Sequence, residues 1–403
     1  MADGPLTGIR VLDVSHNLAG PLTGMHLGDL GAEVIKIERP SGDEWRFHEV
    51  VPGHPGRSRH HLQTNRNKRA VCIDLTTPDG QGIAHELIRR SDVLVTNLRP
   101  GTPERLGIGW VTCAALNDRL VYCQISAYGD GGPKREQRGY DIVTEAIGGF
   151  MPPAWATSDD PPRPSPIPIN DTGLPLLACT GILAALLERE RSGRGQRVEL
   201  SLLGMAVALN AHSLVQLHDQ PPQVMAFPRA FYRVYETSDG WIAIAAYAER
   251  LAHRFCAALG MAELLHEERF RTRAERVERN DELVGLFAPR IRTASTAHWT
   301  EVLDEAGVPS GPVRERDALF DDPQVAAMGM LADVTDAELG RVTMMAPSVR
   351  LSRTPGEIRF TGRHLGADTR AVLTELGHSP QRIAAWEADG VVVTLPADPA
   401  GSA

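Results

Sequence analysis

One aspartate stands where a long apolar segment begins. Asn170-Asp171-Thr172-Gly173 is followed by an apolar stretch from Leu174 that becomes charged before Arg191, the pattern of a buried helix with a solvated C-terminal end. Asp171 then has two interpretations. It is an N-cap that stabilises the helix by roughly 1 kcal/mol, or it is a carboxylate with a chemical role, whose ionised form the helix dipole favours by about 0.3–1 kcal/mol. The residues alone favour the cap.

Polar and cationic side chains follow three of the predicted strands. They are Ser15-His16-Asn17, Glu38-Arg39 and Asn97-Leu98-Arg99. The carboxyl ends of parallel strands meet at one edge of a sheet, where α/β proteins open their ligand crevice. With Arg105, the guanidinium groups of Arg39 and Arg99 suit a phosphorylated ligand. Solvated loop charges are the alternative.

Three cations lie within five residues in Asn65-Arg66-Asn67-Lys68-Arg69. A solvated turn is the favoured interpretation and a phosphate site is the alternative. The chain contains no GxGxxG after its first strand, no GxxxxGK[ST] and no GxSxG. The pattern of strands and helices is therefore no evidence for a nicotinamide or nucleoside triphosphate enzyme.

Cysteine and histidine spacing does not indicate a metal site. The five cysteines contain no CxxC pair, and we expect them to be buried small hydrophobes, with a lone nucleophilic thiol as the minor alternative. The fourteen histidines form no HExxH and no Cys/His cluster, so no metal is expected. The cysteines are Cys72, Cys113, Cys123, Cys179 and Cys256.

Short branched apolar runs alternate with helical patterns through the first half of the chain. Helices are expected near 20–30 and over 77–90, where Thr77-Pro78-Asp79 supplies a cap, a first-turn proline and an acid. This order predicts an α/β fold with a parallel sheet. Strands are expected at 9–14, 33–37, 71–75, 93–96 and 120–126.

A second, smaller domain is expected after a strand at 197–201 and a helix over 202–217. It starts with a hairpin whose turn contains Asp239-Gly240, and amphipathic helices fill it to about Leu319. Strand patterns return from Gly340, and helices follow at 369–376 and 380–388.

Length and charge narrow the class of protein. The 403 residues, 42% hydrophobic and 23% charged, fit two or three domains. A formal charge of −9 disfavours nonspecific nucleic-acid binding and gives no reason to expect a membrane surface as partner. No apolar run approaches the roughly 20 residues that span a bilayer, and the N-terminus lacks signal-peptide order. We expect a cytoplasmic protein.

Several motifs stand together in one order, and their combination resembles the class III coenzyme A transferases (CaiB/BaiF-like), which include formyl-CoA transferase and α-methylacyl-CoA racemase. The resemblance runs from about Gly8 to Leu203 and returns in HLGADTRAVLTELG. The motifs are DVSHNLAGPLTGMHLGDLGAEVIKIERP, TNRNKRAVCIDLTTPDG, NLRPGTPERLGIGW, RGYDIVTEAIGG, INDTG and GILAALLERERSGRGQRVELSLL.

The resemblance implies a Rossmann-like large domain with a smaller α+β domain inserted into it. Residues 1–222 and 333–403 would form the large CoA-binding domain, with C-terminal helices and a flexible tail, and residues 223–332 the small one. It also implies an interlocked homodimer.

The resemblance further implies that Asp171 is the nucleophile. It would attack an acyl-CoA donor to give an aspartyl anhydride and then an aspartyl-CoA thioester, from which a carboxylic acid acceptor takes CoA. Coenzyme A is then substrate, with no permanently bound cofactor. Lys68 is expected with the arginines at the strand ends, where cations would concentrate despite the net charge. The implied CoA-binding residues are His16, Asn17, Leu18, Ala19, Arg39, Ile73, Asn97, Leu98, Arg99, Arg105, Arg138 and Tyr140.

Two alternatives to CoA transfer stay open. An α-methylacyl-CoA racemase needs an acid and a base on opposite faces of its substrate, but Tyr140 stands where those members carry histidine and Ala248 where they carry glutamate. The other alternative is an acyl-CoA-binding protein without turnover. Leu18 replaces a glutamine of the formyl-CoA transferase branch, which disfavours formyl-CoA and oxalate exchange.

Overall fold

A computed structural model describes residues 4–151, 162–219 and 229–395. Contacts within the chain divide it into two compact units, residues 1–215 with 326–403, and residues 216–325. The predicted junctions followed residues 222 and 332. The first of these junctions and the predicted flexible tail after 395 fall outside the described residues.

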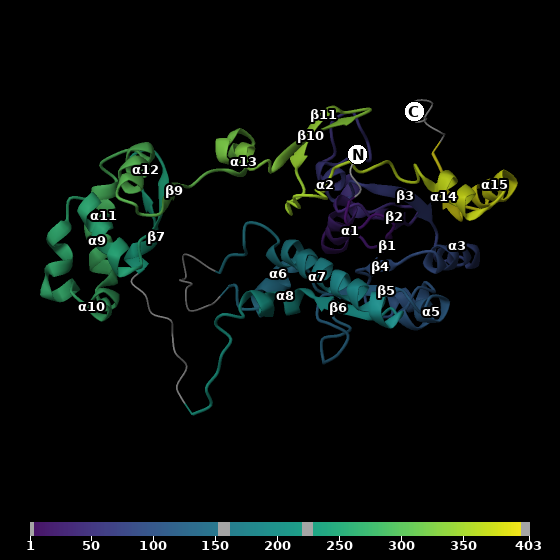
Figure 1. Ribbon diagram of the computed structural model, residues 1–403, viewed down its shortest axis with the longest axis horizontal. Helices are drawn as coiled ribbons and strands as arrows, with labels where there is room; N and C mark the ends of the chain where they lie inside the picture. Colours follow the sequence, from purple (N-terminus) through teal and green to yellow (C-terminus); the bar gives the residue numbers. More distant parts are fainter. Residues whose placement is uncertain (1–3, 152–161, 220–228, 396–403) are drawn as a thin grey trace. The chain divides into compact units, whose positions relative to one another are not determined.

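The described part of the first unit is built on a seven-stranded sheet in the order β12-β3-β2-β1-β4-β5-β6 (Figure 1). All neighbours are parallel except β12, which runs antiparallel to β3. The order 3-2-1-4-5-6 is the doubly wound arrangement, so the predicted parallel α/β core is confirmed. The strands are β1 Arg10–Val14, β2 Glu33–Glu38, β3 Lys68–Ile73, β4 Val93–Thr96, β5 Val121–Ser126, β6 Arg197–Ser201 and β12 Val392–Val393.

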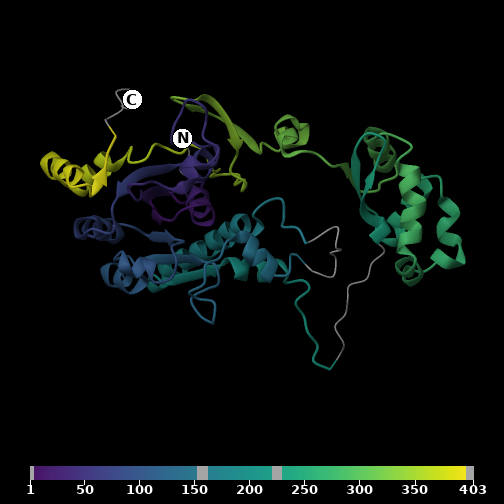
Figure 2. The same ribbon diagram turned by 180° about the vertical axis from the view of Figure 1, so that it is seen from behind.

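Successive strand residues point to opposite faces, and each face has its own apolar core. Val11 and Val95 pack under α1 (Ala19–Asp29) and α7 (Ile169–Ser192). Leu12 and Leu94 pack against the helices of the other face. The helices of that other face are α3 Pro78–Arg89, α5 Trp110–Leu116, α14 Thr369–Leu376 and α15 Pro380–Ala388. Figure 2 shows the C-terminal helices α14 and α15, in yellow, at one end of the first unit, and α14 contacts β3.

Helix α7 is longer than predicted and meets the length and apolarity of a bilayer-spanning helix, with a mean hydropathy of 1.4. The expectation that no apolar segment approaches that length was wrong. One side of α7 carries Leu174, Ala178, Ile182 and Ala185 into the sheet core, as a core helix does. Its charged last turn ends at Gly193, whose φ of 76° closes the helix.

The cationic cluster Arg66, Lys68 and Arg69, at the start of β3, is neither a solvated turn nor a phosphate site. Arg66 and Lys68 are almost completely buried. The Arg66 guanidinium donates to Asp29 at 2.6 and 3.0 Å, and Lys68 Nζ donates to Asp13 at 2.8 Å. The placement of Lys68 among the strand-end cations was therefore wrong, because the ammonium neutralises a buried carboxylate beneath α1.

Two element lengths differ from the prediction for local reasons. Strand β3 begins three residues early because the Lys68 side chain is buried with its ammonium paired. Helix α8 (Leu202–Leu209) ends eight residues early at Asn210, whose side-chain amide donates to the carbonyls of Gly148 and Ala206. That amide competes with the helical hydrogen-bond pattern.

All five cysteines are buried free thiols, as predicted. Burial raises the pKa of Cys72, Cys113 and Cys256 to about 12. Such thiols remain protonated at neutral pH and are poor nucleophiles.

The described part of the second unit joins a three-stranded antiparallel sheet to a helical layer around Phe231, Phe255, Phe287 and Trp299. The predicted hairpin is confirmed as β7 paired with β8. Its strands and helices are β7 Tyr232–Glu236, β8 Trp241–Ala245, β9 Ser310–Pro312, α9 Glu249–Ala258, α10 Arg273–Glu278, α11 Asn280–Ile291 and α12 Thr296–Glu305.

Shorter elements connect these layers. In the first unit the β10–β11 hairpin belongs to the returning segment, and its Met345 carbonyl accepts from Arg66. Helix α13 spans the second junction. These elements are α2 Arg59–Thr64, α4 Thr102–Arg105, α6 Asp141–Ile147, α13 Pro323–Ala327, β10 Leu331–Asp336 and β11 Gly340–Met345, with 3-10 turns at Glu44–Phe47, Arg229–Phe231, Ala262–His266, Glu268–Phe270 and Arg316–Asp321.

Candidate active site

Two neighbouring cavities open at the carboxyl ends of the parallel strands in the first unit. The Asp171 cavity has a volume of about 390 Å³ and the Arg39 cavity about 260 Å³. His16 and Glu44 line both, so the cavities adjoin. This is the sheet edge at which doubly wound folds bind ligands.

The structure brings most of the predicted site residues to these cavities. Ile73, Leu98 and Arg39 line the Arg39 cavity, together with His16. Among the predicted site residues, Arg105 is absent from the described lining of both cavities. Its guanidinium donates to Thr102 Oγ1 at 3.2 Å. The predicted residues that line the Asp171 cavity are His16, Asn17, Leu18, Ala19, Asn97, Arg99, Arg138, Tyr140 and Asp171.

The loop between β1 and α1 forms one wall of the Asp171 cavity. His16 N–H donates to Asn97 Oδ1 at 2.8 Å, and Asn97 Nδ2 donates back to the His16 carbonyl at 2.7 Å. Asn17 has a φ of 62°, a left-handed conformation that asparagine tolerates better than most residues. The β4 loop therefore fixes the backbone of the β1 loop.

A buried charged network supports the same loop from below. The Asp43 carboxylate accepts the Asn17 N–H at 3.2 Å and lies 3.9 Å from Lys36 Nζ. The Lys36 ammonium lies 3.6 Å from Asp13 and donates to the Ser15 carbonyl. Burial lowers the pKa of His16 despite the opposing charge of Asp43, so its imidazole is neutral at pH 7.

The nucleophile candidate Asp171 lies in the first turn of α7, which begins at Ile169. Asp171 is not the N-cap; that prediction was wrong, because the helix starts two residues earlier with Pro168 in the cap position. The capping carboxylate comes instead from α6: Asp141 Oδ1 accepts the N–H groups of Asn170 at 2.7 Å and of Asp171 at 3.0 Å.

The electrostatics at Asp171 differ from those of an N-cap carboxylate. Burial, with a smaller contribution from the Asp141 charge, raises the pKa of Asp171 to about 7. The prediction that the helix N-terminus holds this carboxylate in its ionised form was therefore wrong, because burial favours the protonated form. A carboxylate that ionises near neutral pH and is poorly solvated is a stronger nucleophile than one stabilised by several amides.

Two guanidinium groups in the Asp171 cavity are available for an anion. For Arg99 and Arg138, no side-chain hydrogen bond or ion pair is found within the part of the chain that the structure describes. Arg135, also in the cavity wall, pairs with Asp130 and Glu136. Within the described residues, the cavity thus holds two unpaired guanidinium groups together with the Asp171 carboxyl group.

The sequence interpretation missed Asp141, Trp45 and His48. The one local sign of a role for Asp141 is its place as an acid in the first turn of a short helix. Its hydrogen bonds reach residues of α7 about 30 positions further along the sequence, which no local pattern indicates. Trp45 and His48 lie in the wall of the Asp171 cavity from a loop after β2. No short spacing links that loop to Asp171.

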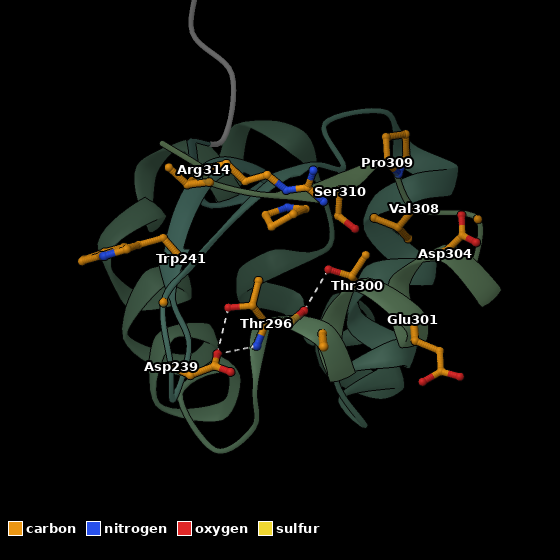
Figure 3. A pocket seen from close by; sticks show the side chains of 15 residues that line it. Asp239, Trp241, Thr296, Thr300, Glu301, Asp304, Val308, Pro309, Ser310 and Arg314 are labelled. Carbon is orange, nitrogen blue, oxygen red and sulfur yellow. Dashed lines mark hydrogen bonds between the residues drawn. The ribbon is translucent and has the colours of Figure 1, made fainter. Parts of the chain in front are cut away.

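The second unit holds a larger open hollow of about 910 Å³. Figure 3 shows that Asp239 faces Thr296, and its carboxylate accepts from the Thr296 N–H and hydroxyl at 2.7 and 2.9 Å. Of the described residues that line it, none belongs to the predicted site, and Arg314 pairs with Asp322. The described residues that line the hollow include no arginine without an ion pair.

Comparison with known proteins gives one consistent result. Residues 6–369 match the model of CoA-transferase family III. A succinyl-CoA–D-citramalate CoA-transferase of Chloroflexus aurantiacus is 35% identical, covering 92% of this chain and 94% of that protein. The human succinyl-CoA:glutarate CoA-transferase is 31% identical, covering 92% and 86%.

Solved structures agree at the level of the fold. Rv3272 from Mycobacterium tuberculosis is 29% identical with a TM-score of 0.82, covering 93% of this chain and all of that one. A CAIB/BAIF family protein from Brucella suis is 28% identical with a TM-score of 0.81, with the same coverage.

Proposed function

Because the chain belongs to CoA-transferase family III, we propose that it transfers CoA from an acyl-CoA thioester to a carboxylic acid through covalent intermediates on Asp171. The observation that carries this proposal is the position of Asp171, a poorly solvated carboxyl group in a strand-end cavity that also holds Arg99 and Arg138. The cavity supplies both a nucleophile and cations for an anionic coenzyme.

The proposed reaction balances without ATP. The Asp171 carboxylate attacks the thioester carbonyl, and CoA thiolate leaves as a mixed anhydride forms. The thiolate attacks the aspartyl carbonyl, which releases the donor acid and leaves an aspartyl-CoA thioester. The acceptor carboxylate attacks that thioester, and the released thiolate then attacks the acceptor side of the new anhydride. The products are acceptor-CoA and free Asp171.

The coenzyme would occupy both cavities. Ile73 and Leu98 give the Arg39 cavity apolar walls that suit adenine, and Arg39 lies there for a phosphate. Arg99 would take further phosphate oxygens near the Asp171 cavity. Arg105, exposed on α4, would contribute at the outer edge. This placement leaves the thioester end of CoA at Asp171.

Short dicarboxylic acids are the proposed acyl groups. The relatives act, by their names, on succinyl-CoA with citramalate, glutarate or malate. A dicarboxylic acid retains one carboxylate after CoA transfer, and that anion needs a cation. Arg138 and Arg135 line the Asp171 cavity and would meet this need, although Arg135 is also paired with Asp130.

A homodimer is proposed because α6, α7 and α8, which pack on one another, all expose large apolar side chains. Leu176 and Leu187 of α7 are 55% and 61% exposed, and Ile142 of α6 and Val207 of α8 about half. Exposed apolar side chains on neighbouring helices are typical of an interface, and a second copy would cover them, in the interlocked form that the family resemblance implies.

The racemase alternative lacks its second proton carrier. Glu249, next to Ala248, is paired with Arg276, and that hydrogen bond lowers the pKa of its carboxyl group. Tyr140 lines the Asp171 cavity at the position where the racemases carry histidine, the commonest general base. Neither group suits removal of an α-proton.

One experiment tests the proposed chemistry directly. The protein is incubated with succinyl-CoA, treated with hydroxylamine and analysed by peptide mass spectrometry. We expect a hydroxamate at Asp171, and no CoA transfer by Asp171→Asn. Asp79→Asn, the same change in the first turn of α3, should retain activity and serves as the control. Full transfer activity in Asp171→Asn would refute the mechanism.

A further inference from the structure

The Asp171 cavity and the Arg39 cavity meet between two segments of the chain. The loop after β1 contributes His16, the 3-10 turn after β2 contributes Glu44, and each of these residues lines both cavities. A coenzyme that occupies both cavities runs past these two residues, which therefore border the passage between the cavities. The separation of the two segments decides whether the arm of the coenzyme can pass.

One buried carboxylate binds both segments. Asp43 Oδ1 accepts the Trp45 N–H at 3.0 Å, and the Asn17 N–H lies 3.3 Å from Oδ1 and 3.2 Å from Oδ2. Trp45 directly follows Glu44, and Asn17 directly follows His16. The Asp43 side chain is almost completely buried, so water does not compete for these bonds. Asp43 therefore ties the two borders of the passage together.

The bond to Asn17 supports a backbone conformation that needs support. Asn17 has its φ of 62° in the left-handed region, and a residue other than glycine stays there only where the surrounding structure holds it. Asn97 holds the preceding residue, His16, through its N–H and its carbonyl. Asp43 holds the Asn17 N–H itself. Without that acceptor the loop can relax toward a commoner conformation, and the border of the passage moves with it.

The position of Asp43 is fixed from strand β2. Its own N–H donates to Glu38 Oε2 at 2.9 Å, and Arg46 donates to the Glu38 carboxylate at 2.6 and 2.7 Å. Lys36 Nζ lies 3.9 Å from Asp43 Oδ2. Glu38 and Lys36 both belong to β2. The central sheet thus fixes Asp43, and Asp43 fixes the passage.

We propose that Asp43 is a positioning residue for the coenzyme: its carboxylate holds the loop after β1 and the turn after β2 at the separation that lets the arm of CoA reach Asp171. The inference rests on the proposed function, in which CoA spans both cavities. A carboxylate is required because both of its oxygens accept and its charge faces Lys36. Asp43→Asn keeps one oxygen but places an NH₂ group against the N–H of either Asn17 or Trp45.

Calorimetry on the full-length protein tests this with two ligands, CoA and adenosine 3′,5′-bisphosphate, which lacks the pantetheine arm. We expect Asp43→Asn to raise the Kd for CoA about tenfold, the effect of one lost hydrogen bond. The Kd for the bisphosphate should change by less than about twofold, since only CoA crosses the passage. An equal change for both ligands, or an unchanged Kd for CoA, would overturn the proposal.

Steady-state kinetics give a second readout. Asp43 acts on coenzyme binding, so the KM for succinyl-CoA should rise in Asp43→Asn while kcat at saturation stays close to that of the wild type. A fall in kcat with an unchanged KM would place the effect of Asp43 on the chemical step and contradict the proposed role.

Asp336→Asn is the matched control. Asp336 is also a buried carboxylate that accepts two backbone N–H groups, those of Glu338 and Leu339 at 3.0 and 3.1 Å, and pairs with Arg57. It is absent from the described lining of both cavities. The control should lose stability in urea unfolding as Asp43→Asn does, yet bind CoA with the wild-type Kd. Equal weakening of CoA binding in both variants would assign the effect to lost stability.

A double-mutant cycle tests whether Asp43 acts through the loop after β1. Asn97 holds the same loop, so the loss of CoA affinity in the double variant Asp43→Asn with Asn97→Asp should be smaller than the product of the two single losses. Two losses that simply multiply would refute this route. If Asp43→Asn does not fold, Asp43→Ser keeps an N-cap for the turn but is too short to reach Asn17, and the same selective loss of CoA affinity is expected.

Failure of the proposed function would look different. Wild-type protein without CoA transfer or an Asp171 adduct refutes the reaction, whereas active wild-type protein with unchanged CoA binding in Asp43→Asn refutes only the role of Asp43.

Discussion

The His16 backbone and the Asn97 side chain exchange two hydrogen bonds, one in each direction, at 2.8 and 2.7 Å. This pair joins the loops after β1 and β4, which are neighbours in the sheet. The wall of the Asp171 cavity is thereby set by an amide that is both donor and acceptor. Few side chains other than asparagine provide both within that distance.

Asn97→Asp should weaken coenzyme binding. The aspartate keeps the acceptor for His16 N–H but places a second oxygen against the His16 carbonyl. Loss of one hydrogen bond plus this repulsion should raise the Kd for CoA about tenfold, measured by calorimetry. Asn117→Asp also loses an amide that donates to two carbonyls, those of Ile88 and Ser91, but lies away from the cavity. That control should bind CoA normally; equal weakening in both would contradict the prediction.

Activity should depend on pH through Asp171. Its pKa is raised to about 7, and only the ionised carboxylate attacks a thioester. We therefore expect kcat/KM to fall about tenfold per pH unit below 7 and to level off above it. A profile that stays flat down to pH 5 would show that Asp171 ionises with an ordinary carboxyl pKa.

Asp171→Asn should stabilise the protein at alkaline pH. The folded state holds the Asp171 proton more tightly than the unfolded chain, so this group's contribution to stability is full below about pH 4 and is lost as pH rises to 7. The carboxyl is partly exposed, which reduces the effect, so we expect Asp171→Asn to raise the free energy of unfolding at pH 8 by about 2 kcal/mol. Urea unfolding at pH 8 and pH 5 measures this increase. It should be smaller at pH 5; an increase of equal size at both pH values would contradict the linkage.

The parallel sheet is predictable because its strands are short branched apolar runs, which a sheet covered on both faces requires. Strand β4 was predicted with the bounds it has, Val93–Thr96. The start of α7 was predicted wrongly, because an acceptor for its first amides lies on α6 and no local capping residue marks the true beginning of the helix.

The candidate site was predictable in its position more than in its chemistry. The strand-end rule placed His16, Asn97 and Arg99 at one crevice without reference to distance in sequence. The pKa of Asp171 depends instead on burial and on Asp141, both consequences of tertiary packing. Arg66 and Lys68 show the same limit, since their spacing suggests a polar surface while their partners Asp29 and Asp13 bury them.

Arg66→Met tests the buried Arg66–Asp29 ion pair, whose arginine also bonds to the returning segment of the large unit. Arg66 donates through two nitrogens to Asp29 and through the third to the Met345 carbonyl of the returning segment. Methionine fills the space but leaves Asp29 as a buried charge with only Asn67 as side-chain donor among the described residues. We expect a loss of about 3–5 kcal/mol in urea unfolding. Replacing Asp29 with leucine in the same protein should recover most of it, because the cost lies in the unpaired charge. A single variant that loses less than about 1 kcal/mol would show that the pair is screened like a surface salt bridge.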